Sequence, residues 1–240
     1  LTLLGIGTHL ASPDSDPEYT RWQIESFLSF VAAARARGIR LPNLHVASSG
    51  ALLRYPEAHL DMVRLGGLLY GMPPSAAPEG LQPVLSLYTQ IVYLRDLPAG
   101  VRVGYGSSFS TKRSTRLATL PVGYHDGYLH HLSNRAQVLI RGQRAPVVGR
   151  VTMDYIMVDV TEISGASVGD CVTLLGQDGE HSISAADLAA WAGTIPYEIP
   201  SHLGPRVVRR YHGTATTPGA PRFAVGTDGP PERLSLRVRS

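Results

Sequence analysis

The sequence predicts two kinds of fold in one chain: a mixed α/β part with parallel strands, followed by an antiparallel β-domain. In residues 1–75, short apolar runs alternate with segments of helical periodicity, which is typical of βαβ units. In residues 85–212, short runs of alternating polarity are separated by glycine-containing turns, which is typical of antiparallel sheets. Residues 76–84, in a region rich in proline and glycine, are predicted to be a linker.

The first part is predicted to have the order strand, helix, strand, helix, strand. Its strands are expected at residues 1–10, 44–47 and 62–65, and the apolar first strand is expected to be buried on both faces. Ser15 or Asp16 can cap the first helix, with Pro17 in its first turn and Gly38 at its end. Apolar residues recur in this helix at helical spacing, at Ile24, Phe27, Leu28 and Val31. A brief second helix is predicted at residues 50–55.

Polar residues lie at or near the C-terminal ends of the predicted strands, namely His9, Ser48, Ser49 and Arg64. Alternating strands and helices give parallel strands with right-handed crossovers, so these ends meet at one edge. Enzymes built as βα-barrels place their chemistry at that edge. Three strands cannot close a barrel, which typically needs eight, so taken alone this segment is an open piece.

Residues 85–212 are predicted to form an all-β domain. Its strands are expected within residues 85–97, 116–123, 136–142, 145–151, 156–163 and 171–176. A turn is expected at Arg141-Gly142-Gln143. One helix is predicted at residues 184–192, with Ser184 as its cap and Asp187 at its third position. Residues 213–240 lack sustained periodicity and are predicted to be a disordered tail.

The tyrosine in the stretch VGYG is a candidate acid or base. Gly104 and Gly106 flank Tyr105, so the backbone there can take positive φ values or let a ligand approach. The phenol is then the only bulky group at the turn. The competing interpretation from composition alone is an exposed aromatic residue on a strand.

Composition and charge exclude several classes of protein. The net charge of +3 comes from scattered arginines without a basic run, so nucleic-acid binding is not expected. No apolar run reaches the ~20 residues that cross a bilayer, so no membrane association is expected. Cys171 is the only cysteine, which excludes an internal disulfide, and it is predicted to be a buried strand residue in a reducing cytoplasm.

A metal site is not expected either. His125, His130 and His131 with Asp126 form the one suggestive cluster, but adjacent histidines on a strand point to opposite faces. No second cluster of ligands is evident. The pair Gly104-x-Gly106 also lacks the following helix of a dinucleotide-binding fingerprint.

Five stretches carry the most specific pattern in the chain. They are residues 8–23 (THLASPDSDPEYTRWQ), 44–71 (LHVASSGALLRYPEAHLDMVRLGGLLYG), 101–128 (VRVGYGSSFSTKRSTRLATLPVGYHDGY), 148–160 (VGRVTMDYIMVDV) and 193–207 (GTIPYEIPSHLGPRV). In this order they resemble the alanine racemases, pyridoxal-phosphate enzymes that interconvert L- and D-alanine. The resemblance runs from about Leu1 to Tyr211. It implies that residues 1–75 are the C-terminal strands and helices of a TIM-like (β/α)8 barrel, followed by the family's C-terminal β-domain.

The resemblance also implies roles for residues of the first part towards the cofactor, pyridoxal 5'-phosphate. Arg64 would donate to the pyridine nitrogen and restrain side reactions. His9 would belong to the hydrogen-bond network that links this arginine to the catalytic tyrosine. Ser49, Gly66 and Gly67 would hold the cofactor phosphate, where a hydroxyl and backbone amides are suitable donors.

In the second part, the resemblance implies that Tyr105 reaches into the partner subunit's barrel in a homodimer. There it would exchange the α-proton of alanine on one face of the cofactor. Met153 would offer its backbone amide to the substrate carboxylate. Tyr124 would narrow the channel that admits the substrate, and Asp14 would lie farther out on that route.

The implied function is alanine racemisation in the cytoplasm, which supplies D-alanine for peptidoglycan. In the family, the lysine that holds the cofactor lies on the first barrel strand, upstream of Leu1, so the chain is expected to begin inside a larger protein. Lys112, the only lysine, lies in a polar turn and is not expected to replace it. Two alternatives stay open: a broad-specificity or serine racemase of the same fold, and a non-catalytic β-domain interaction module.

Overall fold

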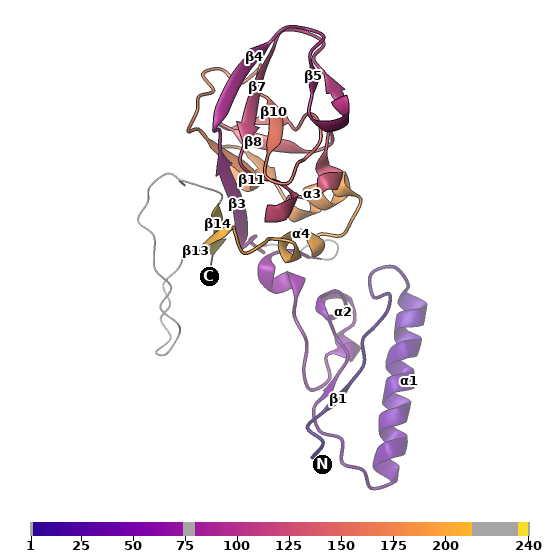
Figure 1. The fold of residues 1–240 in the computed structure, drawn as a ribbon. Helices are drawn as coiled ribbons and strands as arrows, with labels where there is room; N and C mark the ends of the chain where they lie inside the picture. Colours follow the sequence, from indigo (N-terminus) through magenta and orange to yellow (C-terminus); the bar gives the residue numbers. More distant parts are fainter. Residues whose placement is uncertain (1, 74–79, 213–234, 240) are drawn as a thin grey trace. The chain divides into compact units, whose positions relative to one another are not determined.

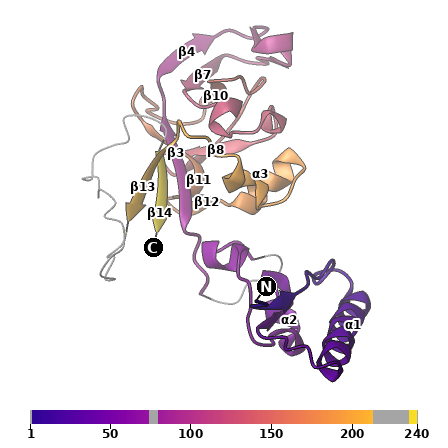
Figure 2. The same cartoon turned by 60° about the horizontal axis from the view of Figure 1, so that its bottom comes forward.

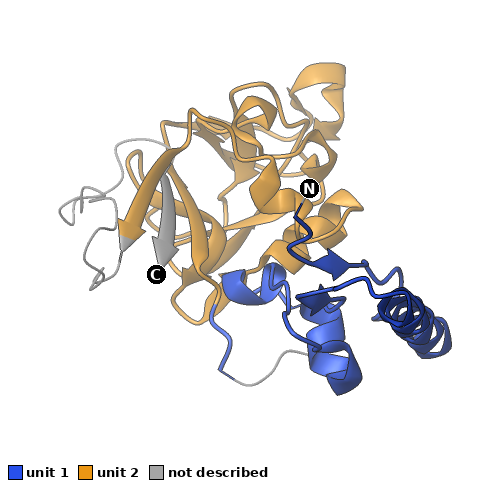
Figure 3. Ribbon diagram, turned by 90° about the horizontal axis from the view of Figure 1, so that it is seen from below, with its two compact units in different colours: residues 1–82 blue, residues 83–240 orange. Residues whose placement is uncertain are grey.

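The computed structural model describes residues 2–73, 80–212 and 235–239. The chain divides into two compact units, residues 1–82 and residues 83–240, which Figure 3 shows in blue and orange. The first unit combines short parallel strands with helices, and the second is rich in β-structure, so both kinds of secondary structure expected from the sequence are present. Residues 76–79 of the predicted linker lie outside the described residues.

The first unit is dominated by helix α1, Pro17–Ala36 (Figure 1). Asp16 is its cap, and its carboxylate accepts a hydrogen bond from the Tyr19 backbone N–H at 3.0 Å. Pro17 occupies the first turn, where an N–H would have no partner inside the helix. Gly38, just beyond the helix, has a φ of 77°, which a residue without Cβ adopts at little cost. The predicted start and end of this helix are confirmed.

One face of α1 forms the core of the first unit. The buried residues of this face are Thr20, Ile24, Phe27, Val31 and Ala34. They belong to a cluster that also contains Leu10, Leu41, Leu44, Val46, Ala47, Ala51, Tyr55 and Ala58. Leu28 was expected on the same face but is 38% exposed, because it lies at the edge of the buried stripe.

The strands of the first unit are short. Strand β1 (Ile6–Gly7) pairs in parallel with β2 (Leu44–His45), as expected for a strand-helix-strand unit. The remaining elements are α2 (Ser49–Arg54) and the 3-10 helices η1 (Pro56–Ala58) and η2 (Gly67–Tyr70). Leu3 and Leu4 are 46% and 75% exposed, so the prediction that the first strand is buried on both faces was wrong there.

The prediction of a third strand at residues 62–65 was also wrong, because this segment does not form a strand. It still runs beside β2. The backbone N–H of Asp61 donates to the Leu44 carbonyl at 3.1 Å, and that of Arg64 donates to the Ala47 carbonyl at 3.0 Å. These two bonds fix the path of the segment without forming a strand ladder.

The second unit contains one large sheet, whose strands lie in the order β13-β14-β3-β11-β8-β9, with β12 paired to β11 (Figure 2). The bounds are β3 (Leu85–Gln90), β8 (Gln137–Ile140), β9 (Gln143–Pro146), β11 (Cys171–Asp178), β12 (His181–Ile183), β13 (Val208–His212) and β14 (Ser235–Arg239). A three-stranded sheet has the order β10-β7-β4, and β5 pairs with β6. Their bounds are β4 (Tyr93–Leu97), β5 (Arg102–Val103), β6 (Phe109–Ser110), β7 (Thr115–Leu120) and β10 (Ile156–Asp159).

Strand β14 corrects the prediction of a disordered tail over residues 213–240. It pairs in parallel with β13 and antiparallel with β3, so it lies between these two strands in the large sheet. Its pairing with β13 also departs from a purely antiparallel domain. Residues 213–234, the rest of the predicted tail, lie outside the described residues.

The turn and the helix cap predicted from local sequence in the second unit are confirmed. Arg141 and Gly142 both have positive φ values, 53° and 73°, which suits the tight turn of a hairpin between β8 and β9. Helix α3 (Ala185–Ala192) begins with a capping box. In it, Ser184 Oγ accepts from the Asp187 N–H at 3.1 Å, and the Asp187 carboxylate accepts from the Ser184 N–H at 2.8 Å. Helix α4 (Glu198–Ser201) follows.

Two predictions in this unit were wrong. Cys171 is exposed rather than buried, because it occupies the first position of β11, before the buried run of that strand begins. His130 and His131 lie in a 3-10 helix, η5 (His130–Leu132), and not on a strand.

Among the described residues, no group of three His, Cys, Asp or Glu side chains is placed to hold a metal ion. Over the same residues, no helix is both long enough and apolar enough to span a membrane.

Candidate functional site

The first unit brings Arg64 and His9 together through a cluster of polar contacts. Arg64 Nη2 donates to the Thr8 carbonyl at 2.8 Å and lies 3.5 Å from His9 Nδ1. Arg64 Nη1 donates to the His45 carbonyl at 3.2 Å and also contacts His45 Nδ1. Because Thr8 directly follows β1 and His45 is the last residue of β2, the two paired strands determine where the guanidinium lies.

His45 is also part of the arginine cluster, although it is not among the site residues predicted from the sequence. It is the last residue of β2 and is half-buried. A signal was present, since a histidine interrupts the apolar run of residues 44–47 at the same strand end as Ser49. An imidazole nitrogen facing a guanidinium acts as a hydrogen-bond acceptor, so His45 orients Arg64.

A second cluster joins Ser49 to the glycine pair. Ser49 is 6% exposed and begins α2, and its Oγ accepts the Gly66 N–H at 3.0 Å and the Leu68 N–H at 3.5 Å. The space beside Gly66 is open, since a Cβ there would meet no atom within 4 Å. Gly67 is the first residue of η2, where a backbone N–H has no partner inside the helix.

Asp14 lies beside this second cluster. Its carboxylate oxygens are 3.0 Å from where a Cβ on Gly50 would be, so the side chain covers the first turn of α2. Arg54 holds it from the other side, with Nε 3.8 Å from Asp14 Oδ1 and Nη1 donating to the Asp14 carbonyl at 2.7 Å. Asp14 is therefore fixed next to Ser49.

In the second unit, Tyr105 stands on the surface of a tight turn, the 3-10 helix η3 (Tyr105–Ser107). It is 72% exposed. Gly104 and Gly106 have φ values of 71° and 68°, so the predicted positive φ at both positions is confirmed. A Cβ on Gly106 would lie 3.1 Å from Cζ of Arg150, so the Arg150 guanidinium lies directly against the turn.

Tyr105, Tyr124 and Met153 line one pocket of about 660 Å³, together with His130, Arg150 and Asp154. Tyr124 begins another 3-10 helix, η4 (Tyr124–Asp126). The His130 ring lies edge-on to the Tyr124 ring, with 6.4 Å between the two ring centroids. The Met153 carbonyl accepts the His125 N–H at 3.2 Å. Within the described part of the chain, the Met153 N–H has no acceptor.

The turn that carries Tyr124 also contains a buried phenol. Tyr128 is 2% exposed, and its hydroxyl has no hydrogen-bond partner among the described residues. Burial raises the pKa of the Tyr128 phenol well above its usual range, because the charged form would lose its hydration. Tyr128 is therefore a buried phenol, whereas the Tyr105 side chain is exposed.

The fold and these sites define a class of protein in which a βα unit presents an arginine–histidine cluster and a β-rich unit presents a glycine-flanked tyrosine at a pocket. The family model "Alanine racemase, N-terminal domain" matches residues 1–74, and the model "Alanine racemase, C-terminal domain" matches residues 84–211. The chain belongs to the alanine racemase family.

Individual relatives agree with this membership. An alanine racemase of Desulfovibrio desulfuricans is 48% identical over 213 residues, which are 87% of this chain and 57% of that relative. An alanine racemase from a D-cycloserine-producing Streptomyces lavendulae superposes with a TM-score of 0.82 at 36% identity, over 88% of this chain and 56% of that one. That of Bartonella henselae, with covalently bound pyridoxal phosphate, superposes with a TM-score of 0.75 at 33% identity, over 84% and 54%. The chain thus spans little more than half the length of these relatives.

Proposed function

We propose that this chain is the C-terminal part of an alanine racemase that interconverts L- and D-alanine with pyridoxal 5'-phosphate. The observation that carries the proposal is the convergence of Tyr105, Tyr124 and Met153 on one pocket in a chain whose two units both match the family. Residues 1–75 would belong to a (β/α)8 barrel, and residues 85–212 to the β-domain. The complete protein would act as a homodimer in the cytoplasm.

The residues of the first unit fit the cofactor. Arg64 carries only donors, and its two Nη atoms contact two backbone carbonyls and two histidines. No contact among the described residues uses its Nε–H, so this donor would serve a pyridine nitrogen. The Ser49 hydroxyl, which accepts two backbone N–H groups, still has a proton to donate to a phosphate oxygen. Gly67 offers a backbone N–H, and Gly66 leaves open space beside it.

When bound, pyridoxal phosphate supplies an electron sink that stabilises negative charge at the α-carbon of the amino acid. Tyr105 would take or give the α-proton at its phenolic oxygen on one face of the substrate. Met153 would donate its unpaired N–H to the substrate carboxylate, and the neighbouring Tyr124 ring would limit the size of side chain admitted. Asp14 would lie on the substrate's route beside the phosphate-binding residues.

The test is racemisation by the complete gene product, followed by circular dichroism or chiral chromatography with L-alanine, L-serine and larger amino acids in competition. A strong preference for alanine is expected. Equal turnover of serine would favour the broad-specificity alternative. No racemisation of any amino acid by protein that retains pyridoxal phosphate would contradict the proposal and favour a non-catalytic interaction module.

A further inference from the structure

Three segments that are distant in sequence meet at the pocket of the second unit: residues 123–127, 152–154 and 202–206. The Tyr124 N–H donates to the Thr152 carbonyl at 3.0 Å, and the His125 N–H donates to the Met153 carbonyl at 3.2 Å. On the other side, the Gly204 N–H donates to the Asp126 carbonyl at 3.1 Å. The turn that carries Tyr124 therefore lies between the other two segments.

The contact is too close for side chains at the glycines of this turn. A Cβ on Gly123 would lie 2.3 Å from the carbonyl oxygens of Thr152 and Met153. A Cβ on Gly127, whose φ is 101°, would lie 2.4 Å from the His202 carbonyl oxygen. Because backbone meets backbone at both places, a small shift of one segment must move the others.

Arg206 joins all three segments through its guanidinium. Its Nε donates to Asp126 Oδ1 at 3.0 Å, and its Nη2 donates to Asp154 Oδ1 at 2.8 Å. Asp126 is 6% exposed, and its other oxygen accepts the Gly123 N–H at 2.9 Å. One planar side chain thus connects the turn of Tyr124 to the residue that follows Met153.

The two hydrogen bonds of Arg206 to Asp126 and Asp154, called the Arg206 fork below, fix geometry and add little to the free energy of unfolding. The hydrogen bond to Asp154 raises the pKa of Arg206, and Asp126 adds to the shift, so the guanidinium stays charged. Arg206 is well exposed, and ion pairs in contact with water contribute little to the free energy of unfolding. A fork of donors nonetheless fixes the relative orientation of two carboxylates.

We propose that Arg206 is a positioning residue that holds the turn of Tyr124 against the loop of Met153. The statement that Tyr124 and Met153 face the substrate rests on the proposed function. The contact that Arg206 makes between the turn and the loop, called the clamp below, does not rest on it. Losing the fork lets the turn and the loop separate, which weakens substrate binding more than it slows the chemical step at Tyr105.

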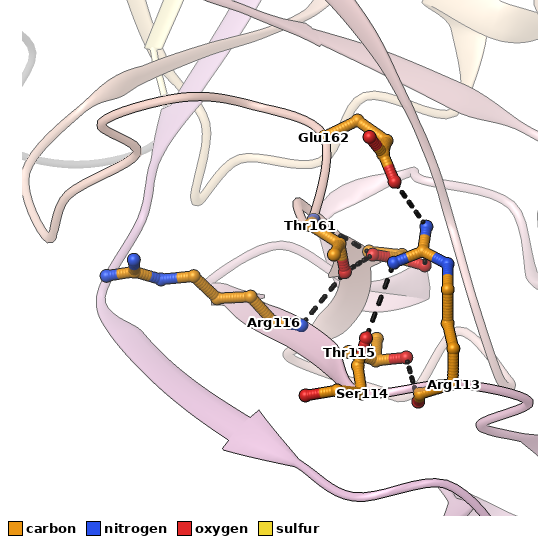
Figure 4. Close-up of polar contacts among 7 residues, drawn as sticks. Arg113, Ser114, Thr115, Arg116, Thr161 and Glu162 are labelled. Carbon is orange, nitrogen blue, oxygen red and sulfur yellow. Dashed lines mark hydrogen bonds and ion pairs between the residues drawn. The ribbon is translucent and has the colours of Figure 1, made fainter.

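The chain offers a matched control in Arg113, an arginine that also faces two carboxylates. Its Nη2 lies 2.9 Å from Glu162 and 3.8 Å from Asp159, and its exposure, 49%, is close to the 44% of Arg206 (Figure 4). It lies two residues before β7, and it does not line the pocket of Tyr124 and Met153. Arg113→Gln therefore removes a comparable ion-pair fork without touching that pocket.

The first experiment measures backbone amide exchange in the complete protein, comparing Arg206→Gln with Arg113→Gln. We expect Arg206→Gln to speed exchange of the Tyr124 and His125 amides on the order of 10-fold, with exchange of the β11 amides unchanged. Arg113→Gln should leave the Tyr124 and His125 amides as they are. Unchanged exchange at these two amides in Arg206→Gln, or an equal change in Arg113→Gln, would overturn the proposal.

If Arg206→Gln does not fold, Asp154→Ala tests the same contact, because it removes one of the two hydrogen bonds of the fork at a half-exposed side chain.

The second experiment measures the kinetics of the complete protein. Arg206→Gln should raise KM for alanine at least several-fold more than it lowers kcat, and Arg206→Lys should restore part of the loss. Normal KM and kcat in Arg206→Gln would remove its role in the reaction. A wild-type protein that fails to racemise would instead contradict the proposed function, and the exchange experiment would still decide the clamp.

Discussion

The two units hold their candidate functional groups in opposite ways. In the first unit, backbone carbonyls at the ends of β1 and β2 fix Arg64 within a half-buried cluster. In the second unit, Tyr105 is 72% exposed, and the positive φ values of two glycines and the Arg150 guanidinium against Gly106 shape its turn. Arg64 is therefore positioned by the strands themselves, whereas Tyr105 depends on the backbone of one short turn.

The largest effect is expected from Tyr105→Phe in the complete protein, because it removes one hydroxyl and leaves the ring and the turn in place. Loss of one positioned base typically costs ~10²–10⁴-fold in rate. If Tyr105 serves one face only, α-proton exchange in deuterium oxide should fail from one enantiomer of alanine and continue from the other. Equal, unimpaired exchange from both enantiomers would show that Tyr105 is not this base.

Arg64→Glu should have the next largest effect, since it replaces a fixed donor by an acceptor in the first unit. We expect turnover of the complete protein to fall on the order of 10²-fold, as for the loss of a preorganised donor. Retention of pyridoxal phosphate, measured by its absorbance after dialysis, should fall much less, because Ser49 and Gly67 are untouched. Arg21→Glu, which affects the surface pair with Glu57 in the same unit, serves as the charge-matched control. Normal turnover with bound cofactor would contradict the role of Arg64.

A comparison of two glycines separates backbone strain from contact. Gly38 and Gly106 have similar φ values, 77° and 68°, but a Cβ would meet nothing within 4 Å at Gly38 and the Arg150 guanidinium at Gly106. Alanine at either position should lower the free energy of unfolding by about 1–2 kcal/mol, measured by urea denaturation. Only Gly106→Ala should also reduce turnover, because it displaces Arg150 under the Tyr105 turn. Equal turnover in the two variants would contradict this dependence on the turn.

The smallest effect is expected from Tyr128→Phe, which contrasts a buried phenol with the exposed one at Tyr105. Near neutral pH, removing a buried hydroxyl without a partner should change the free energy of unfolding by less than about 1 kcal/mol. Because the pKa of Tyr128 is raised in the folded state, its contribution to stability is full below the unfolded pKa of ~10 and is lost as pH rises above it.

Urea denaturation at pH 7 and at pH above ~10 checks this linkage, since an unfolded tyrosine titrates near that pH. The wild-type chain should lose stability over this interval more steeply than Tyr128→Phe. Tyr105→Phe, which alters an exposed phenol, is the matched control and should follow the wild type. Parallel pH profiles for wild type and Tyr128→Phe would show that burial of Tyr128 does not govern alkaline stability.

Features that depend on a few neighbouring residues could be predicted from the sequence alone. Asp16 and Pro17 predict the start of α1, and Ser184 with Asp187 predicts that of α3, because a cap satisfies N–H groups only two or three positions away. The positive φ of Gly106 follows in the same way, since it needs only the absence of a Cβ. The motifs around Tyr105 and Met153 likewise identified residues that share one pocket.

Features that need a partner far along the chain became visible only in the folded structure. Residues 62–65 have the composition of a strand but lack a ladder, while β14 forms one in a segment without periodicity, because strand pairing depends on which edge is available. The same holds for single side chains. No local pattern could show that Arg206 reaches Asp126 across 80 positions of sequence, because such a contact exists only after the segments between them have folded.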